Sequence, residues 1–221
     1  MPYRQALAIN VRLGDVAGQA STLGQLGNLY GDVLGRTEEA IRFYRLAADK
    51  YVEIGDQATE GVARNNIADA LRKLHRLTEA RQEIHRAIEC KAPFGHASEP
   101  WKSWEILAMI ETADGNPTAA AEARAKAIDC YLSCRRDGGE NHFTQGRIAL
   151  AVTQALQAGD NTAAAGLLQP LAADPDYALL HTFIHALQAI VAGSRDPQLA
   201  HAPDLHYAMA AEILLLLEKL K

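Results

Sequence analysis

The sequence is short of the features that mark several classes of protein. Its 221 residues include three cysteines, an odd number and too few for a disulfide framework. Apolar residues never run uninterrupted for the roughly 18 positions that a membrane-spanning helix needs. Residues 1–5 lack the basic and then apolar pattern that begins a secretory signal. We therefore expect a reducing, cytoplasmic setting and no contact with a membrane.

The chain also lacks an excess of basic residues. It carries 22 Lys and Arg against 27 Asp and Glu, a formal net charge of −5. Proteins that bind nucleic acids usually concentrate a basic excess in one patch, so we do not expect a nucleic-acid partner. No glycine-rich nucleotide fingerprint occurs. The length is ample for a continuous core, so no structural metal is needed.

What the sequence does have is an internal repeat with a long period. A six-residue segment that ends in alanine, and begins with glycine in three of four cases, occurs at 35–40, 75–80, 115–120 and 159–164. The spacings are 40, 40 and 44 residues between Ala40, Ala80, Ala120 and Ala164. Seven positions after each of these stand Ala47, Ala87, Ala127 and Leu171. A fixed period of this length is typical of repeat architectures.

Each repeat is predicted to form two amphipathic helices. In residues 20–34 apolar residues recur every three or four positions, which is helical spacing. Gly35 follows, and glycine ends helices because it adopts the left-handed conformation easily. Residues 38–54 repeat the pattern up to Gly55. Two helices can cross closely only where side chains are small, and Gly27, Ala68 and Ala108 on the first helices face the repeat alanines on the second.

These features predict an all-α fold. A single helix pair cannot bury its apolar face alone, so the pairs must stack into an α-solenoid of antiparallel helix hairpins, with about 11 helices. Residues 1–136 hold the clear repeats, as a partial first unit 3–15 and full units 16–55, 57–95 and 98–136. Residues 137–221 are predicted to hold degenerate helices of the same kind and a C-terminal capping helix.

The repeat resembles that of the tetratricopeptide-repeat (TPR) family. The family's first helix carries a large residue, then leucine and a small residue, and its second carries alanine, a large apolar residue and alanine. The first full unit matches at Leu23, Leu26, Gly27, Tyr30, Ala40, Tyr44 and Ala47. The second and third match at Ile67, Ala68, Leu71, Ala80, Ile84, Ala87, Trp104, Leu107, Ala108, Ala120 and Ala127. The pattern is broken by Arg64, Glu111 and Arg124.

The 40-residue period is longer than the family's usual period of about 34. It is similar to the long-period subclass of kinesin light chain, of Leu-Gly-Asn-repeat adaptors and of bacterial signalling proteins. The segment Leu26-Gly27-Asn28-Leu29-Tyr30 resembles the sequence motif of that subclass. The resemblance implies a TPR-like right-handed superhelix, and a scaffold for protein–protein interaction within a larger bacterial signalling protein.

The resemblance also implies which residues would contact a ligand. In the family the first helix of each pair lines a concave groove that binds a peptide. The positions carried over are Asn28, Asp32, Asn65, Asn66, Asp69, Arg72, Lys73, Glu105, Met109 and Thr112. Asparagine suits this role because its amide both donates and accepts hydrogen bonds. Gly24 stands where the carboxylate clamp of some members has its first lysine, so we do not expect a chaperone-tail ligand.

The two ends of the chain differ from the repeats. Residues 3–13 match a second helix whose partner is missing, which suggests a piece of a longer protein or a helix that acts as a cap. Residues 204–220 form a leucine-rich helix that is apolar on more than one face and must pack against something. A terminal cap is the simpler interpretation, and a dimer surface is the alternative. Residues 194–203, with two prolines, are predicted to be a loop.

Candidate catalytic chemistry is sparse. His181 and His185 lie four apart on a predicted helix and could hold a metal, but Thr182 stands where a zinc protease has glutamate. We therefore expect no catalysis, no cofactor and no metal. The leading hypothesis is a scaffold that binds a peptide, or a neighbouring domain of the same polypeptide, in the groove. The alternatives are a module that self-associates through its end helices and, less favoured, a metal protein or enzyme.

Overall fold

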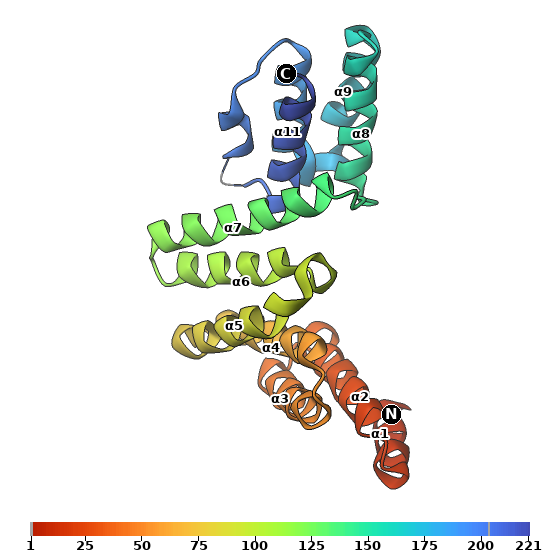
Figure 1. Cartoon of the computed structure of the whole chain (residues 1–221), viewed down its shortest axis with the longest axis vertical. Helices are drawn as coiled ribbons and strands as arrows, with labels where there is room; N and C mark the ends of the chain where they lie inside the picture. Colours follow the sequence, from red (N-terminus) through yellow and green to blue (C-terminus); the bar gives the residue numbers. More distant parts are fainter. Residues whose placement is uncertain (1, 203) are drawn as a thin grey trace. The chain divides into compact units, whose positions relative to one another are not determined.

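A computed structural model describes residues 2–202 and 204–221. Two residues lie outside the described ranges. They are residue 1, in the N-terminal segment that lacks a secretory pattern, and residue 203, the last of the predicted loop 194–203. The described chain forms eleven α-helices and no strand (Figure 1). They are α1 (Pro2–Leu13), α2 (Val16–Asn28), α3 (Thr37–Ile54), α4 (Gln57–Lys73), α5 (Leu77–Lys91), α6 (Pro100–Ala113), α7 (Pro117–Arg136), α8 (Thr144–Gln157), α9 (Asn161–Ala173), α10 (His181–Val191) and α11 (Tyr207–Lys219). The prediction of an all-α chain of consecutive helix pairs is confirmed.

Four short turns of other helical types lie between these helices. One is the π-helical turn η1 (Leu29–Val33), which continues directly from α2. The others are the 3₁₀ turns η2 (Ala92–Ser98), η3 (Pro175–Leu180) and η4 (Pro197–Ala200). The turn η4 lies within residues 194–203, for which the sequence predicts a loop. Pro197 begins it and the Asp196 side chain accepts from the Gln198 N–H at 2.9 Å, so local hydrogen bonding gives this segment a helical turn.

At the junctions of α3 with α4 and of α8 with α9, the helices end and begin at the predicted glycine and aspartate residues. Gly55 has a φ of +74° after α3, the left-handed conformation that only glycine adopts without strain. The Asp56 carboxylate then accepts from the Thr59 N–H at 3.1 Å and caps the start of α4. Asp160 caps α9 in the same way. Local residue chemistry therefore sets these helix boundaries.

The chain divides into two compact units, unit 1 up to Ala127 and unit 2 from Ile128 onward. This division falls inside α7, whereas the repeat pattern places the change at residue 137. The first half of α7 contributes Ala123 to the core of unit 1. Its second half belongs to unit 2, where the Arg135 guanidinium pairs with Glu212 of α11 at 2.9 Å. One helix therefore supplies both units.

Unit 1 packs as successive helix pairs around small residues. Its core includes Leu26, Ile67 and Ile84, each almost entirely buried. Gly27 of α2 lies directly against the ring of Tyr44 on α3, so closely that a Cβ atom there would overlap the ring. Of the predicted crossing alanines in this unit, two are fully buried, Ala40 and Ala80. Ala120 is only half-buried, which agrees with the weaker repeat match of its helix pair.

Unit 2 has a core of its own, and α11 is part of it. Phe183 and Leu187 of α10 pack with Ile213 and Leu216 of α11, all at 1% exposure or less. The leucine-rich helix contacts α8, α10 and η4. Most of its apolar residues are therefore covered within unit 2 itself.

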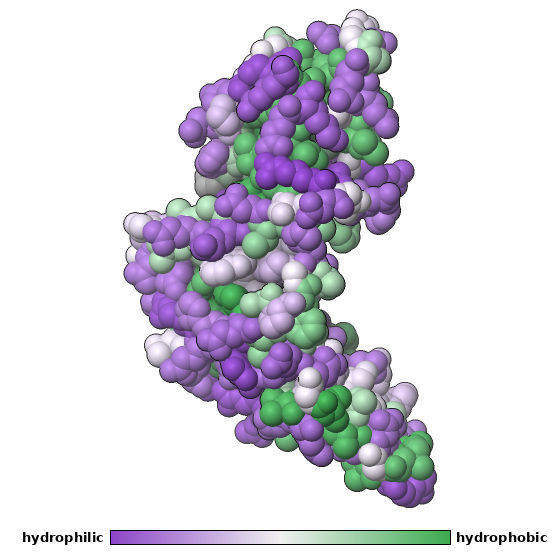
Figure 2. Space-filling model, in the orientation of Figure 1, coloured by the Kyte–Doolittle hydropathy of each residue, from purple (hydrophilic) through white to green (hydrophobic). Residues whose placement is uncertain are grey.

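The first helix contrasts with the last. No residue of α1 is buried, and Ile9, Val11 and Leu13 are each 46% exposed or more. Figure 2 shows apolar surface over this part of unit 1. Among the residues described, no helix has the length and apolar character needed to cross a membrane.

Candidate functional site

Five of the predicted groove residues meet at one narrow pocket in unit 1. The pocket has a volume of about 110 Å³ and lies where η1 and the end of α2 meet α3 and α4. The predicted residues that line it are Asn28, Asp32, Asn66, Asp69 and Lys73. They come from two successive repeats, so stacking of the repeats builds the pocket.

The π-helical turn η1 shapes one side of this pocket. The Leu34 N–H donates to the Leu29 carbonyl oxygen at 3.1 Å, a bond five residues back instead of four. A regular α-helix was expected to continue to Leu34, and the wider turn replaces its end. Gly31 lies within it, and a Cβ atom there would approach the Cβ of Ala40 to 3.3 Å. The absence of a side chain thus lets η1 lie close to α3.

Tyr44 of α3 also lines the pocket and holds Asn28. Its hydroxyl donates to the Asn28 Oδ1 at 2.8 Å, which leaves the Asn28 amide NH₂ available to a ligand. Burial, followed by the nearby charges of Asp32 and Asp69, raises the pKa of Tyr44 to about 12. The phenol is therefore protonated at neutral pH and remains a hydrogen-bond donor.

One of the two carboxylates at the pocket is neutralised by neighbouring basic side chains. The Asp69 carboxylate pairs with Arg72 at 2.8 Å and with Lys73 at 2.9 Å. Burial raises the pKa of Asp69, but the two ion pairs outweigh it and hold that pKa below its usual value. Asp32, in contrast, is exposed and makes no ion pair or hydrogen bond with its side chain to any described residue. Its carboxylate is the uncompensated charge of the pocket.

The other predicted residues lie elsewhere in unit 1. Asn65 is 5% exposed, and its Oδ1 accepts from the Ser103 hydroxyl at 2.9 Å, which ties α4 to α6. Arg72 flanks the pocket through its pair with Asp69. On α6 the Thr112 hydroxyl donates to the Ala108 carbonyl at 2.8 Å, and Met109 is half-buried. These residues are not brought to the pocket.

Glu105 of α6 is the remaining predicted residue. Its Oε2 is buried and finds no hydrogen-bond partner among the described residues. Burial raises the pKa of Glu105, and the nearby Arg124 lowers it in part. The structure thus leaves a carboxylate oxygen of this helix without a donor.

Sequence reasoning missed half of the pocket lining. Gly31, Thr37, Ala40, Tyr44 and Ala70 complete it. Ala40 and Tyr44 were interpreted only as packing positions of the second helix. The polar hydroxyl of Tyr44 beside a repeat alanine is the signal that could have assigned it to the site.

His181 and His185, whose spacing could hold a metal although no metal site is predicted, lie together in the structure. The rings of His181 and His185 stack with their centroids 6.1 Å apart. In the described part of the chain, no group of three or more His, Cys, Asp or Glu residues is placed to hold a metal ion.

No family of known proteins matches the chain, and no curated protein is similar to it.

Proposed function

We propose that the chain is a non-catalytic interaction scaffold of the tetratricopeptide type, working within a larger bacterial signalling protein. It binds a peptide segment, or a neighbouring domain, at the unit 1 pocket. The observation that carries the proposal is the meeting of Asn28 and Asn66, from successive repeats, at one pocket. Amides offer both donors and acceptors, which suit the main chain of an extended peptide without reading its side chains.

The charges at the pocket favour a basic ligand. Arg72 and Lys73 could attract an acidic peptide, but both are already paired with Asp69. Asp32 has no such partner among the described residues, so its carboxylate is available to a lysine or arginine of the ligand. A charged hydrogen bond of this kind is about twice as strong as a neutral one.

The test begins with selection of binders from a displayed library of random twelve-residue peptides. Selected peptides are then titrated by fluorescence polarisation against the whole chain and its variants. We expect Asn28→Ala combined with Asn66→Ala to weaken binding about thirtyfold, because two hydrogen bonds of about 1 kcal/mol each are lost. Gln25→Ala, exposed on α2 outside the pocket, is the matched control. Equal affinity for the double variant and the control would contradict the proposal.

The preference for basic peptides has its own test. Peptides selected with the unchanged chain should be enriched in lysine and arginine. Asp32→Asn keeps the size of the side chain and removes its charge, so selection with that variant should lose the enrichment. An enrichment that survives the substitution would assign it to another part of the surface.

A second candidate function is self-association through α1. It is favoured by the exposed apolar residues Ile9, Val11 and Leu13 on a helix with no buried residue. Light scattering coupled to size exclusion, over a wide range of protein concentration, tests it. A mass that rises with concentration, and returns to 23.9 kDa in Val11→Glu, would support self-association; a constant 23.9 kDa would exclude it.

A further inference from the structure

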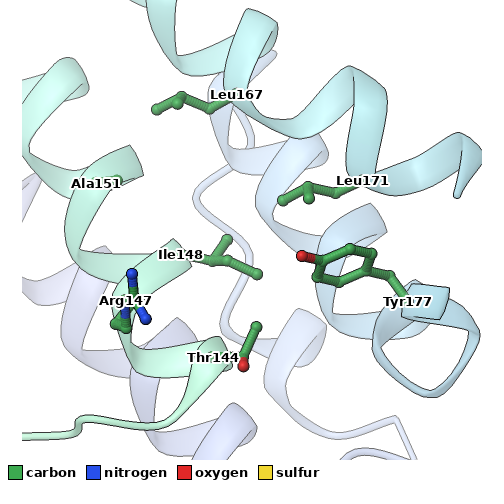
Figure 3. Close-up of a pocket in the computed structure, with 7 residues that line it drawn as sticks. All are labelled: Thr144, Arg147, Ile148, Ala151, Leu167, Leu171 and Tyr177. Atoms are coloured by element: carbon green, nitrogen blue, oxygen red, sulfur yellow. The ribbon is translucent and has the colours of Figure 1, made fainter.

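A larger pocket lies in unit 2, in a cleft between α8, α9 and η3 (Figure 3). Its volume is about 350 Å³, at the lower end of the range of small-molecule sites. The walls are mainly aliphatic, with Ile148 from α8 and Leu167 and Leu171 from α9. Leu167 is 44% exposed, so leucine surface is open to water in this cleft.

Leu171 departs from the repeat pattern at this point. The corresponding positions of the three earlier repeats hold Ala47, Ala87 and Ala127, and each of these is fully buried. Leu171 is half-buried and extends into the cleft instead (Figure 3). At this position the earlier repeats have a buried alanine, whereas the larger leucine of the fourth repeat lines the cleft.

Three side chains that can donate hydrogen bonds also line the cleft. Thr144 and Arg147 lie in the first turn of α8, and Tyr177 lies in η3. Figure 3 shows the Tyr177 hydroxyl pointing across the cleft towards α8. No hydrogen bond or ion pair joins any of these three side chains to another residue in the described ranges 2–202 and 204–221. A guanidinium and two hydroxyls are thus available to a ligand.

We propose that this cleft binds a small alkyl carboxylate. The carboxylate accepts from the Arg147 guanidinium, whose fork of N–H groups matches two carboxylate oxygens. The alkyl chain lies against Ile148, Leu167 and Leu171. A multiply charged anion would leave the aliphatic walls unfilled, and a neutral hydrocarbon would leave the arginine unused.

The test is calorimetric titration of the whole chain with hexanoate, octanoate and 1-octanol below their micelle concentrations. Each added methylene should tighten binding about fourfold, so octanoate should bind about sixteenfold more tightly than hexanoate. Arg147→Met keeps an aliphatic side chain and removes the charge. It should weaken octanoate binding about tenfold or more and leave 1-octanol unchanged. Arg42→Met, exposed on α3 of unit 1, is the control for loss of a charge.

A second variant tests the cavity itself. Ala151 lines the cleft and is half-buried, so Ala151→Leu should fill part of the volume and weaken every alkyl ligand. Ala165→Leu adds the same volume to an exposed position of α9 outside the cleft and should have no effect. Far-UV circular dichroism checks that both variants remain helical.

Three results would overturn the proposal. One is the absence of saturable octanoate binding, and another is octanoate affinity that does not change in Arg147→Met. The third is binding of a short peptide that ends in leucine where octanoate does not bind, which would assign the cleft to a polypeptide terminus.

Discussion

Gly27 and Gly24 lie about one helical turn apart on α2, and their surroundings differ sharply. A Cβ atom on Gly27 would overlap the Tyr44 ring, whereas a Cβ atom on Gly24 would meet nothing within 4 Å. We expect Gly27→Ala to lower the free energy of unfolding by about 1–3 kcal/mol, because the helix pair must separate. Gly24→Ala should raise it by about 0.5–1 kcal/mol through helix propensity alone. Urea denaturation of both variants measures the difference, and equal values would contradict the close packing.

Lys91 gives a second prediction at the scale of one residue. The residue is 3% exposed, and desolvation of its side chain lowers the pKa of the ammonium to about 8, from about 10.4 for a free lysine. The unfolded chain therefore binds more protons between pH 8 and pH 10, so stability contributed by this group rises with pH in that window. The slope should reach up to about 1.4 kcal/mol per pH unit.

The measurement is urea denaturation at several pH values for the unchanged chain and for Lys91→Met. Burial raises the pKa of the neighbouring Cys90 thiol, which acts in the opposite sense, so the difference between the two proteins isolates the lysine. Lys50→Met, at a lysine that pairs with Glu53 and is not among the charges that shift the pKa of Lys91, is the control and should keep the original slope. A Lys91→Met profile parallel to that of the unchanged chain would show that the ammonium is not desolvated.

At the scale of helices, Arg81 joins α5 to α6. Its guanidinium pairs with Glu111 at 2.6 Å and with Asp114 at 2.6 Å, and Glu111 is only 6% exposed. Arg81→Met leaves a buried carboxylate without its cation, so we expect a loss of about 1–3 kcal/mol in the free energy of unfolding. Arg45→Met removes the exposed pair with Glu79 and should cost about 0.5 kcal/mol or less.

A double variant separates the buried charge from the packing of the arginine stem. Glu111→Gln in the Arg81→Met background removes the uncompensated charge, so it should recover part of the lost stability. Chemical denaturation followed by circular dichroism gives all three values. If the double variant is no more stable than Arg81→Met, the loss comes from packing and the ion pair contributes little.

At the scale of the whole chain, two units each have their own core, and the two tryptophans report on one of them. Trp101 and Trp104 are both in unit 1, whereas Phe183 is fully buried in unit 2. Phe183→Ala should destabilise unit 2 by about 3–5 kcal/mol. We expect circular dichroism to show an earlier transition while the midpoint of tryptophan fluorescence stays unchanged.

The converse variant completes this comparison. Ile84 is fully buried in unit 1, so Ile84→Ala should lower the fluorescence midpoint. If Phe183→Ala shifts both signals together, the units unfold as one cooperative structure and the division inside α7 has no thermodynamic meaning.

The sequence by itself determined the helices and their pairing. Glycine at helix ends, aspartate at helix starts and alanine or glycine at crossing points act through local geometry, which repeats wherever the residues repeat. Gly55, Asp56 and Gly27 each have the role that their spacing predicts. Part of the candidate site followed as well, because residues of one helix face share a register from repeat to repeat.

Only the tertiary structure decided which of the candidate residues meet. Asn65 and Asn66 are adjacent on α4, yet Asn65 is buried against Ser103 and Asn66 lines the pocket. The π-helical turn η1 and the pairing of Arg72 and Lys73 with Asp69 also depend on neighbours in space. The physical reason is that a small rotation of one helix against the next exchanges buried and open positions. Periodicity determines that a helix has an inner face, and packing determines where that face ends.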